Sequence, residues 1–269
     1  MNKKQRPRSE GQKGAAKSAV HRGPTAVAPP GVNANITVTV STEASSITNS
    51  LSFLARIWKS NDQWTPEEKR GLCQLTLLSI VAHIEDALRS LVIARLRAAK
   101  ALVPTEQAST TQAVRTMKSL LDSFIDKVST ESTIYKLKEY HDQLGSDTLQ
   151  SVVGDKSYED LVALGDMRNL LAHGRRFEGA WEGQQGRFAF ASTQFDRIVK
   201  QLKSGRIDIS NNPSAQDFHN EWLPTLFSTN SMSYWYAAAT KIEAAILSKF
   251  TPTGDVPPNY FRLPIIEFA

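Results

Sequence analysis

The chain has 269 residues, of which 41% are hydrophobic and 22% are charged, a balance typical of a globular protein. Its single cysteine, Cys73, excludes an intrachain disulfide and a cysteine-based zinc site. No apolar run approaches the ~20 residues that cross a membrane, and no apolar signal region follows the basic N-terminus. We therefore expect a soluble, cytoplasmic protein with no membrane partner.

The positive charge is concentrated at the N-terminal end. The whole chain carries +5, but residues 1–25 hold seven basic side chains and one acidic one, a net +6, which leaves −1 for the remainder. Residues 1–33 are rich in Gly, Pro, Ala, Lys and Arg without an apolar period, which predicts a disordered tail. Such a tail could bind RNA without sequence preference, and a merely solubilising arm explains it equally well.

The first elements are a short strand and two helices. Alternating apolar residues predict the strand at 36–40, and residues 47–59 predict a helix. A long helix begins at Pro66, because Thr65 can cap it and proline suits its first position, and it runs to about Leu102. Apolar residues recur along it with the helical period, which indicates a buried face: Leu77, Ile80, Val81, Ile84, Leu88, Leu91 and Val92.

Further helices follow at 110–129, 132–144, 157–173 and 229–250, with a turn or two at 147–153. In the first of these we expect seven side chains to point inward: Val114, Met117, Leu120, Leu121, Phe124, Ile125 and Val128.

The pattern changes between residues 177 and 210. Apolar residues alternate at 187–190 and at 205–209, and these segments with 36–40 could build a small sheet beside the helices. We therefore predict a mainly α fold, an antiparallel bundle of long helices with a small β element near the C-terminal half. The predicted domain is 34–250 with the β insertion at about 177–210, between a tail of residues 1–33 and a C-terminal tail of 251–269.

Few residues suggest chemistry. The sequence lacks the standard nucleotide-binding, serine-hydrolase and zinc-protease motifs, and one cysteine cannot complete the deaminase zinc site that His83-Ile84-Glu85 would begin. We expect neither a metal nor a cofactor, and we interpret His83 as a polar or boundary residue of the long helix.

One run remains, Asp-Met-Arg-Asn-Leu-Leu-Ala-His-Gly at 166–174. On a helix, Asn169 and His173 share a face, and the long Arg168 side chain can reach them. A guanidinium binds phosphate and an imidazole moves protons near neutral pH, so this trio suits phosphodiester chemistry.

Arg168-Asn169-x-x-x-His173, followed by Gly174, resembles the Arg-x4–6-His signature of HEPN domains. That family also carries an acid on the apolar edge of an earlier helix, and Glu85 in the run Val81–Leu88 stands at the similar place. The resemblance covers roughly residues 66–174. The segment between the two helices, about 103–156, is longer than in a minimal four-helix domain.

The resemblance implies a metal-independent endoribonuclease of a toxin–antitoxin or anti-phage defence system, acting as a homodimer with an antitoxin or other defence partner. It implies catalytic roles for Arg168, Asn169 and His173, with support from Glu85 and Gly174, and we add Arg175 and Arg176 as further RNA contacts. The RNA 2′-OH would attack the adjacent phosphorus while His173 moves the proton and Arg168 holds the phosphate.

Two alternatives stay open, since a fold does not fix a function. The chain could be a non-catalytic HEPN-like module for dimerisation or for binding RNA or a partner, or an adaptor that binds RNA through its basic tail.

Overall fold

The computed structural model divides the chain into two units, residues 1–40 and 41–269, and the second is described here. It is mainly helical, which confirms the predicted class, and none of its described helices is long and apolar enough to cross a bilayer. The described residues are 42–60, 64–104, 111–130, 133–145, 147–172, 179–182, 187–190, 193–209, 221–250 and 262–268. The predicted strand at 36–40 lies outside them.

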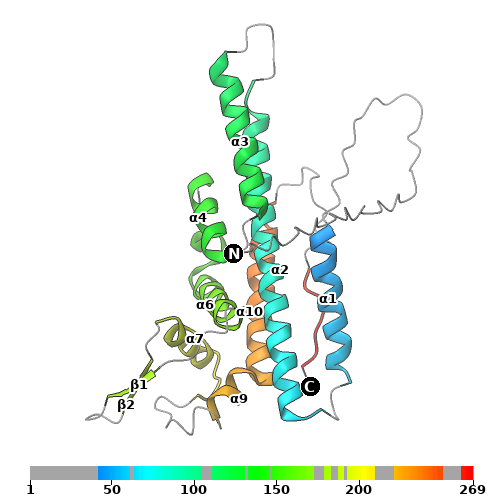
Figure 1. Cartoon of the computed structure of the whole chain (residues 1–269), viewed down its shortest axis with the longest axis vertical. Helices are drawn as coiled ribbons and strands as arrows, with labels where there is room; N and C mark the ends of the chain where they lie inside the picture. Colours follow the sequence, from blue (N-terminus) through cyan, green and yellow to red (C-terminus); the bar gives the residue numbers. More distant parts are fainter. Residues whose placement is uncertain are drawn as a thin grey trace, which may run out of the picture. The chain divides into compact units, whose positions relative to one another are not determined.

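The long helix α2 (Pro66–Ala101) organises the unit. It starts where the sequence predicts: the Thr65 hydroxyl accepts from the Glu68 amide at 3.3 Å, and the Thr65 amide donates to the Glu68 carboxylate at 2.8 Å. Five helices pack against it (Figure 1): α1 (Thr42–Trp58), α3 (Gln112–Thr130), α4 (Ile134–Leu144), α6 (Asp155–Ala172) and α10 (Thr229–Leu247).

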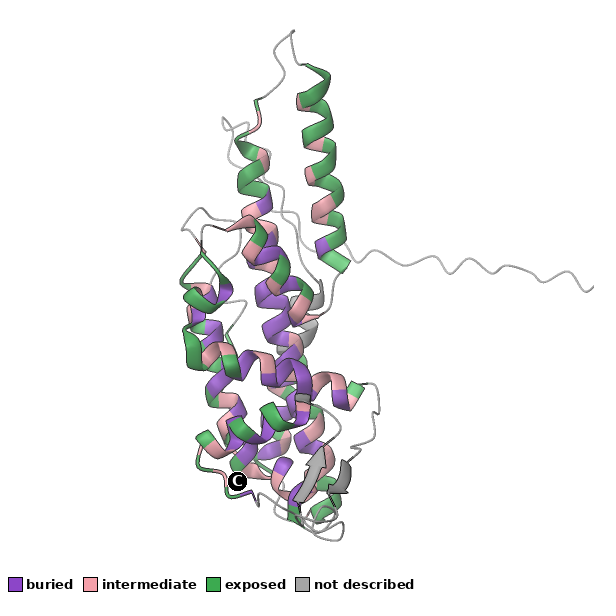
Figure 2. Ribbon diagram, turned by 90° about the vertical axis from the view of Figure 1, so that its left-hand side faces the viewer, coloured by how far each residue is buried: buried purple, intermediate pink, exposed green. Residues whose placement is uncertain are grey.

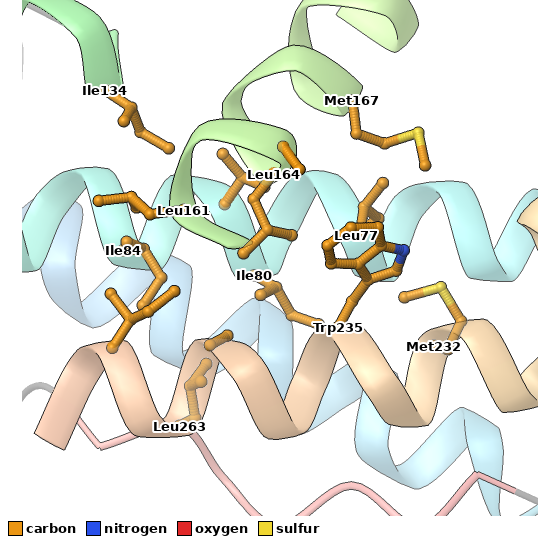
Figure 3. Packing of buried hydrophobic residues seen from close by; sticks show 14 of the residues in the cluster. Leu77, Ile80, Ile84, Ile134, Leu161, Leu164, Met167, Met232, Trp235 and Leu263 are labelled. Carbon is orange, nitrogen blue, oxygen red and sulfur yellow. The ribbon is translucent and has the colours of Figure 1, made fainter. Parts of the chain in front are cut away.

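The core lies where α2, α6 and α10 meet. Leu77, Ile80 and Ile84 of α2 are fully buried, and they pack against apolar side chains of the other two helices (Figure 3). The partners include Leu161, Leu164 and Met167 of α6 with Met232 and Trp235 of α10. Two short helices, α5 (Leu149–Val153) and α9 (Leu223–Leu226), lie just before α6 and α10 in the chain. Cys73 is also buried, which raises the pKa of its thiol to about 12.

The apolar face of α3 is only partly covered. Val128 is its one buried residue, and most of the helix is coloured as exposed (Figure 2). Met117 and Leu120, which the sequence predicts to point inward, are 56% and 65% exposed, so that prediction is wrong for both. The reason is that one side of α3 packs against α2, and no described element covers the opposite side of α3.

The sheet predicted from residues 36–40, 187–190 and 205–209 is not seen within the described residues. Within the described residues, β1 (Gly179–Glu182) pairs antiparallel with β2 (Arg187–Phe190), while residues 207–209 form no strand. Between β2 and residues 207–209 lies a helix that was not predicted from the sequence, α7 (Thr193–Ser204).

The alternation at 205–209 is the stop signal of α7. The Ile207 amide donates to the Leu202 carbonyl at 3.0 Å, and the Arg206 amide donates to the Lys203 carbonyl at 2.9 Å. Arg206 adopts a left-handed φ of 63°, and this pair of bonds is the usual closure of a helix C-terminus. Glycine is required one residue earlier, because a Cβ on Gly205 would lie 2.4 Å from the Tyr234 ring.

The C-terminal segment 262–268 packs on the helices without regular structure. The Leu263 amide donates to both oxygens of Glu243 on α10, at 2.9 and 3.1 Å, and the Tyr236 hydroxyl donates to the Pro264 carbonyl at 2.5 Å. Ile266 is buried, and the Phe268 ring lies 5.1 Å from that of Trp58. The segment therefore closes one side of the core.

Candidate active site

The motif helix α6 brings Arg168 against α2. Met167 is buried in the core, which fixes the helix and directs the neighbouring Arg168 toward the polar edge of α2. Arg168 Nε lies 4.0 Å from the Glu85 carboxylate, and Arg168 Nη1 donates to the Asn169 side-chain oxygen at 3.2 Å. The structure thus brings together three of the predicted site residues.

Glu85 is a carboxyl group with little solvent around it. Its side chain is 7% exposed, and this burial raises the pKa of Glu85 to about 7. Arg168, the backbone amide of Ile134 and Arg89 all favour the ionised form, but they do not outweigh the burial. Glu85 is therefore part-protonated at neutral pH, and its attraction to Arg168 varies with pH in the physiological range.

A second carboxylate neutralises the nearby Arg89. Arg89 Nη1 lies 2.9 Å from Asp86, and both side chains are largely buried. Arg168 is more accessible, since its side chain is 22% exposed and its only ion pair within the described part of the chain is the 4.0 Å contact with Glu85. It is consequently the cation of this cluster that an incoming phosphate could reach.

The remaining predicted site residues lie outside the described residues. Helix α6 ends at Ala172, so His173, Gly174, Arg175 and Arg176 have no described position. The described half of the site consists of Arg168, Asn169 and Glu85, with His173 directly following the last helical residue in sequence.

Sequence reasoning misses a buried carboxylate in the same run. Asp166, two residues before Arg168, is fully buried, and it accepts from the Tyr135 hydroxyl and, at 2.8 Å, from Arg197 Nε. Burial and the hydrogen bond with Asp166 raise the pKa of Tyr135 well above its usual value. Both partners are 31 residues away in the chain, in opposite directions, so spacing could not reveal the cluster.

His83, expected as a polar or boundary residue of the long helix, is a polar residue inside the core. It is buried rather than at the edge of the core, and its Nε2 is hydrogen-bonded to a carboxylate oxygen of Glu243 at 2.7 Å. Because Glu243 also accepts from the Leu263 amide, the pair joins α2, α10 and the C-terminal segment. This position inside the core indicates a structural role for His83.

Comparisons with known proteins give no further guide. No protein-family model, no curated protein and no solved structure matches the chain. The functional inference therefore depends on the residues of the site itself.

Proposed function

We propose that the protein is a metal-independent endoribonuclease that cleaves RNA by attack of the 2′-OH on the adjacent phosphorus. One observation carries the proposal: a partly exposed arginine, Arg168, stands beside a nearly buried carboxyl group. In the sequence, His173 follows Arg168 by five residues and comes directly after the last residue of α6. That combination of a phosphate-binding cation and a proton carrier is what this reaction requires.

The reaction needs one proton removed and one supplied. The 2′-oxygen loses its proton as it bonds to phosphorus, and the departing 5′-oxygen gains one, which leaves a 2′,3′-cyclic phosphate and a 5′-hydroxyl. His173 is the proton carrier, because an imidazole exchanges protons near neutral pH. Arg168 donates to the phosphate oxygens and stabilises the charge that grows on them.

Glu85 positions Arg168 and sets the local charge. Its carboxyl group limits the rotamers of the guanidinium from the buried side, while Asn169 accepts from Nη1 on the other. Since the pKa of Glu85 is about 7, the carboxyl group does not fully neutralise Arg168 at neutral pH. This leaves positive charge at the site, although residues 26–269 carry a net charge of only −1.

The wider setting of the proposal rests on the HEPN resemblance. We include in it a homodimer in which two Arg168–His173 pairs face one another, and a toxin–antitoxin or anti-phage defence role with a neutralising partner. Arg175 and Arg176, just beyond His173, are the basic residues nearest to it in sequence and would add RNA contacts.

The direct test is RNA cleavage in excess EDTA. Purified full-length protein is incubated with total bacterial RNA, beside Arg168→Ala and His173→Ala, and with Arg97→Ala as a matched control because Arg97 is an exposed arginine of α2. We expect cleavage by the wild type and the control, and losses of roughly 10²–10⁴-fold in the two site variants. Equal cleavage by all four proteins would refute the assignment.

The second candidate is a non-catalytic module, and one observation favours it. Arg168 already contacts Glu85 and Asn169 in its own chain, as an arginine with a purely structural role would. Growth of a bacterial host separates the two functions. Expression of the nuclease should slow growth and His173→Ala should relieve it, whereas a binding module should affect growth equally with or without His173.

A further inference from the structure

A cleft next to the candidate site opens between α4, α6 and α7. Its volume is about 370 Å³, within the range of small-molecule sites. Aliphatic and aromatic side chains line it together with three cations and one acid, Glu159. The residues that matter here are Ile134, Tyr135, Lys138, Tyr158, Arg197 and Lys200.

A buried carboxylate, Asp166, holds the Arg197 side chain in place. Its Nε donates to the fully buried Asp166 at 2.8 Å, and the other oxygen of Asp166 accepts from the Tyr135 hydroxyl. The Arg197 side chain remains 46% exposed, and within the described residues its bonds are to Asp166 alone. A guanidinium bonded through Nε keeps the N–H groups of its two terminal nitrogens as donors, and such a pair can bind a phosphate with two parallel hydrogen bonds.

The other two cations of the cleft each lie near an acid, and Lys138 Nζ is 3.5 Å from the Asp142 carboxylate. Lys200 Nζ is 3.4 Å from Glu159, but both side chains are well exposed and this pair is weak. Lys138 Nζ lies 5.6 Å from the centre of the Tyr158 ring, and a hydrogen bond with Tyr158 raises the pKa of that lysine. Lys138 therefore stands close to aromatic surface.

The chemistry of the lining selects one class of ligand. A divalent cation is disfavoured by three positive side chains, and a bare inorganic anion would leave the two tyrosines and the aliphatic wall unused. A nucleotide uses all of them, because aromatic side chains take the base and cations take the phosphate.

The cleft also adjoins the candidate active site. The Ile134 side chain lines the cleft, while its backbone amide bonds to the Glu85 carboxylate. On α6, Asp166 beneath the cleft is two residues from Arg168. A nucleotide in the cleft would therefore share Ile134 with the site that is proposed to hold the scissile phosphate.

We propose that this cleft is a nucleotide-binding site, with the base against Tyr135 and Tyr158 and the phosphate on Arg197 and Lys200. The nucleotide is either a free mononucleotide or one unit of an RNA strand flanking the cut. Only the second source rests on the proposed ribonuclease function, since the first needs no cleavage.

Binding to the full chain tests the proposal without any need for activity. Calorimetric titrations with AMP, UMP, inorganic phosphate and a six-nucleotide RNA are made in EDTA on the His173→Ala protein, which cannot degrade the RNA under the proposed mechanism. The same titrations use Lys200→Glu and Arg197→Lys, the second of which keeps the charge over Asp166 and so protects the fold. Lys241→Ala, at an exposed lysine of α10, is the charge control.

We expect a nucleotide to bind more tightly than phosphate, and both cleft variants to weaken it roughly tenfold while the control does not. Equal binding of AMP and the RNA identifies a free nucleotide as the ligand, and preference for the RNA identifies the strand. The proposal is overturned if neither binds, if phosphate binds as well as AMP, or if the cleft variants bind like the control. Retained nucleotide binding in a protein whose wild type never cleaves RNA would refute the ribonuclease alone.

Discussion

Glu85→Gln should make the protein less sensitive to pH between 5 and 8. Burial raises the pKa of Glu85 from 4.5 to about 7, so in this range the folded state holds a proton that the unfolded state releases. Stability from this group is therefore fully present below pH 4.5 and is lost as the pH rises through 7. Glutamine has no proton to lose, so the variant escapes that loss.

The size of the effect follows from the pKa change. A rise from 4.5 to about 7 is worth about 3 kcal/mol, at about 1.4 kcal/mol for each pKa unit. The free energy of unfolding of Glu85→Gln, minus that of the wild type, should increase by this order between pH 5 and pH 8. At any single pH this difference in unfolding free energy also includes the altered contact with Arg168. The change of the difference with pH is therefore the quantity that tests the prediction.

The assay is urea unfolding followed by far-ultraviolet circular dichroism at constant ionic strength and four pH values. Glu68→Gln serves as the control, because the capping bond with Thr65 lowers the pKa of Glu68 and its contribution changes only below this range. A difference curve for Glu85→Gln that stays as flat as the control would refute the claim that Glu85 is buried and part-protonated.

Three further changes test the packing by the same unfolding measurement. Thr76→Val removes the oxygen that accepts from the Trp58 indole at 2.9 Å, and an unpaired buried donor should cost about 1–3 kcal/mol; an unchanged midpoint would contradict this. Gly205→Ala should cost a similar 1–3 kcal/mol, because its Cβ would overlap the Tyr234 ring, and a neutral result would mean that the ring moves freely. Deleting residues 262–269 exposes the core around Ile266 and removes the Leu263 amide that bonds to Glu243. We expect the free energy of unfolding to fall by roughly 3 kcal/mol or more and proteolysis to become faster. Equal resistance to protease would show that the segment is dispensable.

The sequence predicts those helices whose ends carry their own signals. Helix α2 begins at Pro66, as Thr65 and Pro66 predict, and α4 ends just before Gly145. These ends are predictable because caps act through neighbouring backbone groups. The helix α7 is missed although Phe195, Ile198, Val199 and Leu202 have helical spacing, since the flanking alternations suggest strands. Which apolar face is covered depends on distant segments, and this is why Met117 and Leu120 are predicted wrongly.

The candidate site could likewise be predicted only in part from the sequence. Resemblance of the motif suggests Glu85 as the companion of Arg168, and the two side chains lie 4.0 Å apart. No local pattern could identify Arg197 and Tyr135 as partners of Asp166, because tertiary packing alone brings them together. The pKa of Glu85 is equally a property of burial, which a sequence does not state.

The chemistry of the cut ends tests the central claim most directly. RNA treated with the wild-type protein in EDTA is digested to fragments, and mass spectrometry identifies the group at each new end. From the proposed mechanism we expect 2′,3′-cyclic phosphates and 5′-hydroxyls, no cleavage of an all-DNA substrate, and no such ends with Arg168→Ala. Products with 3′-hydroxyl and 5′-phosphate ends, or cyclic phosphates formed equally by Arg168→Ala, would contradict it.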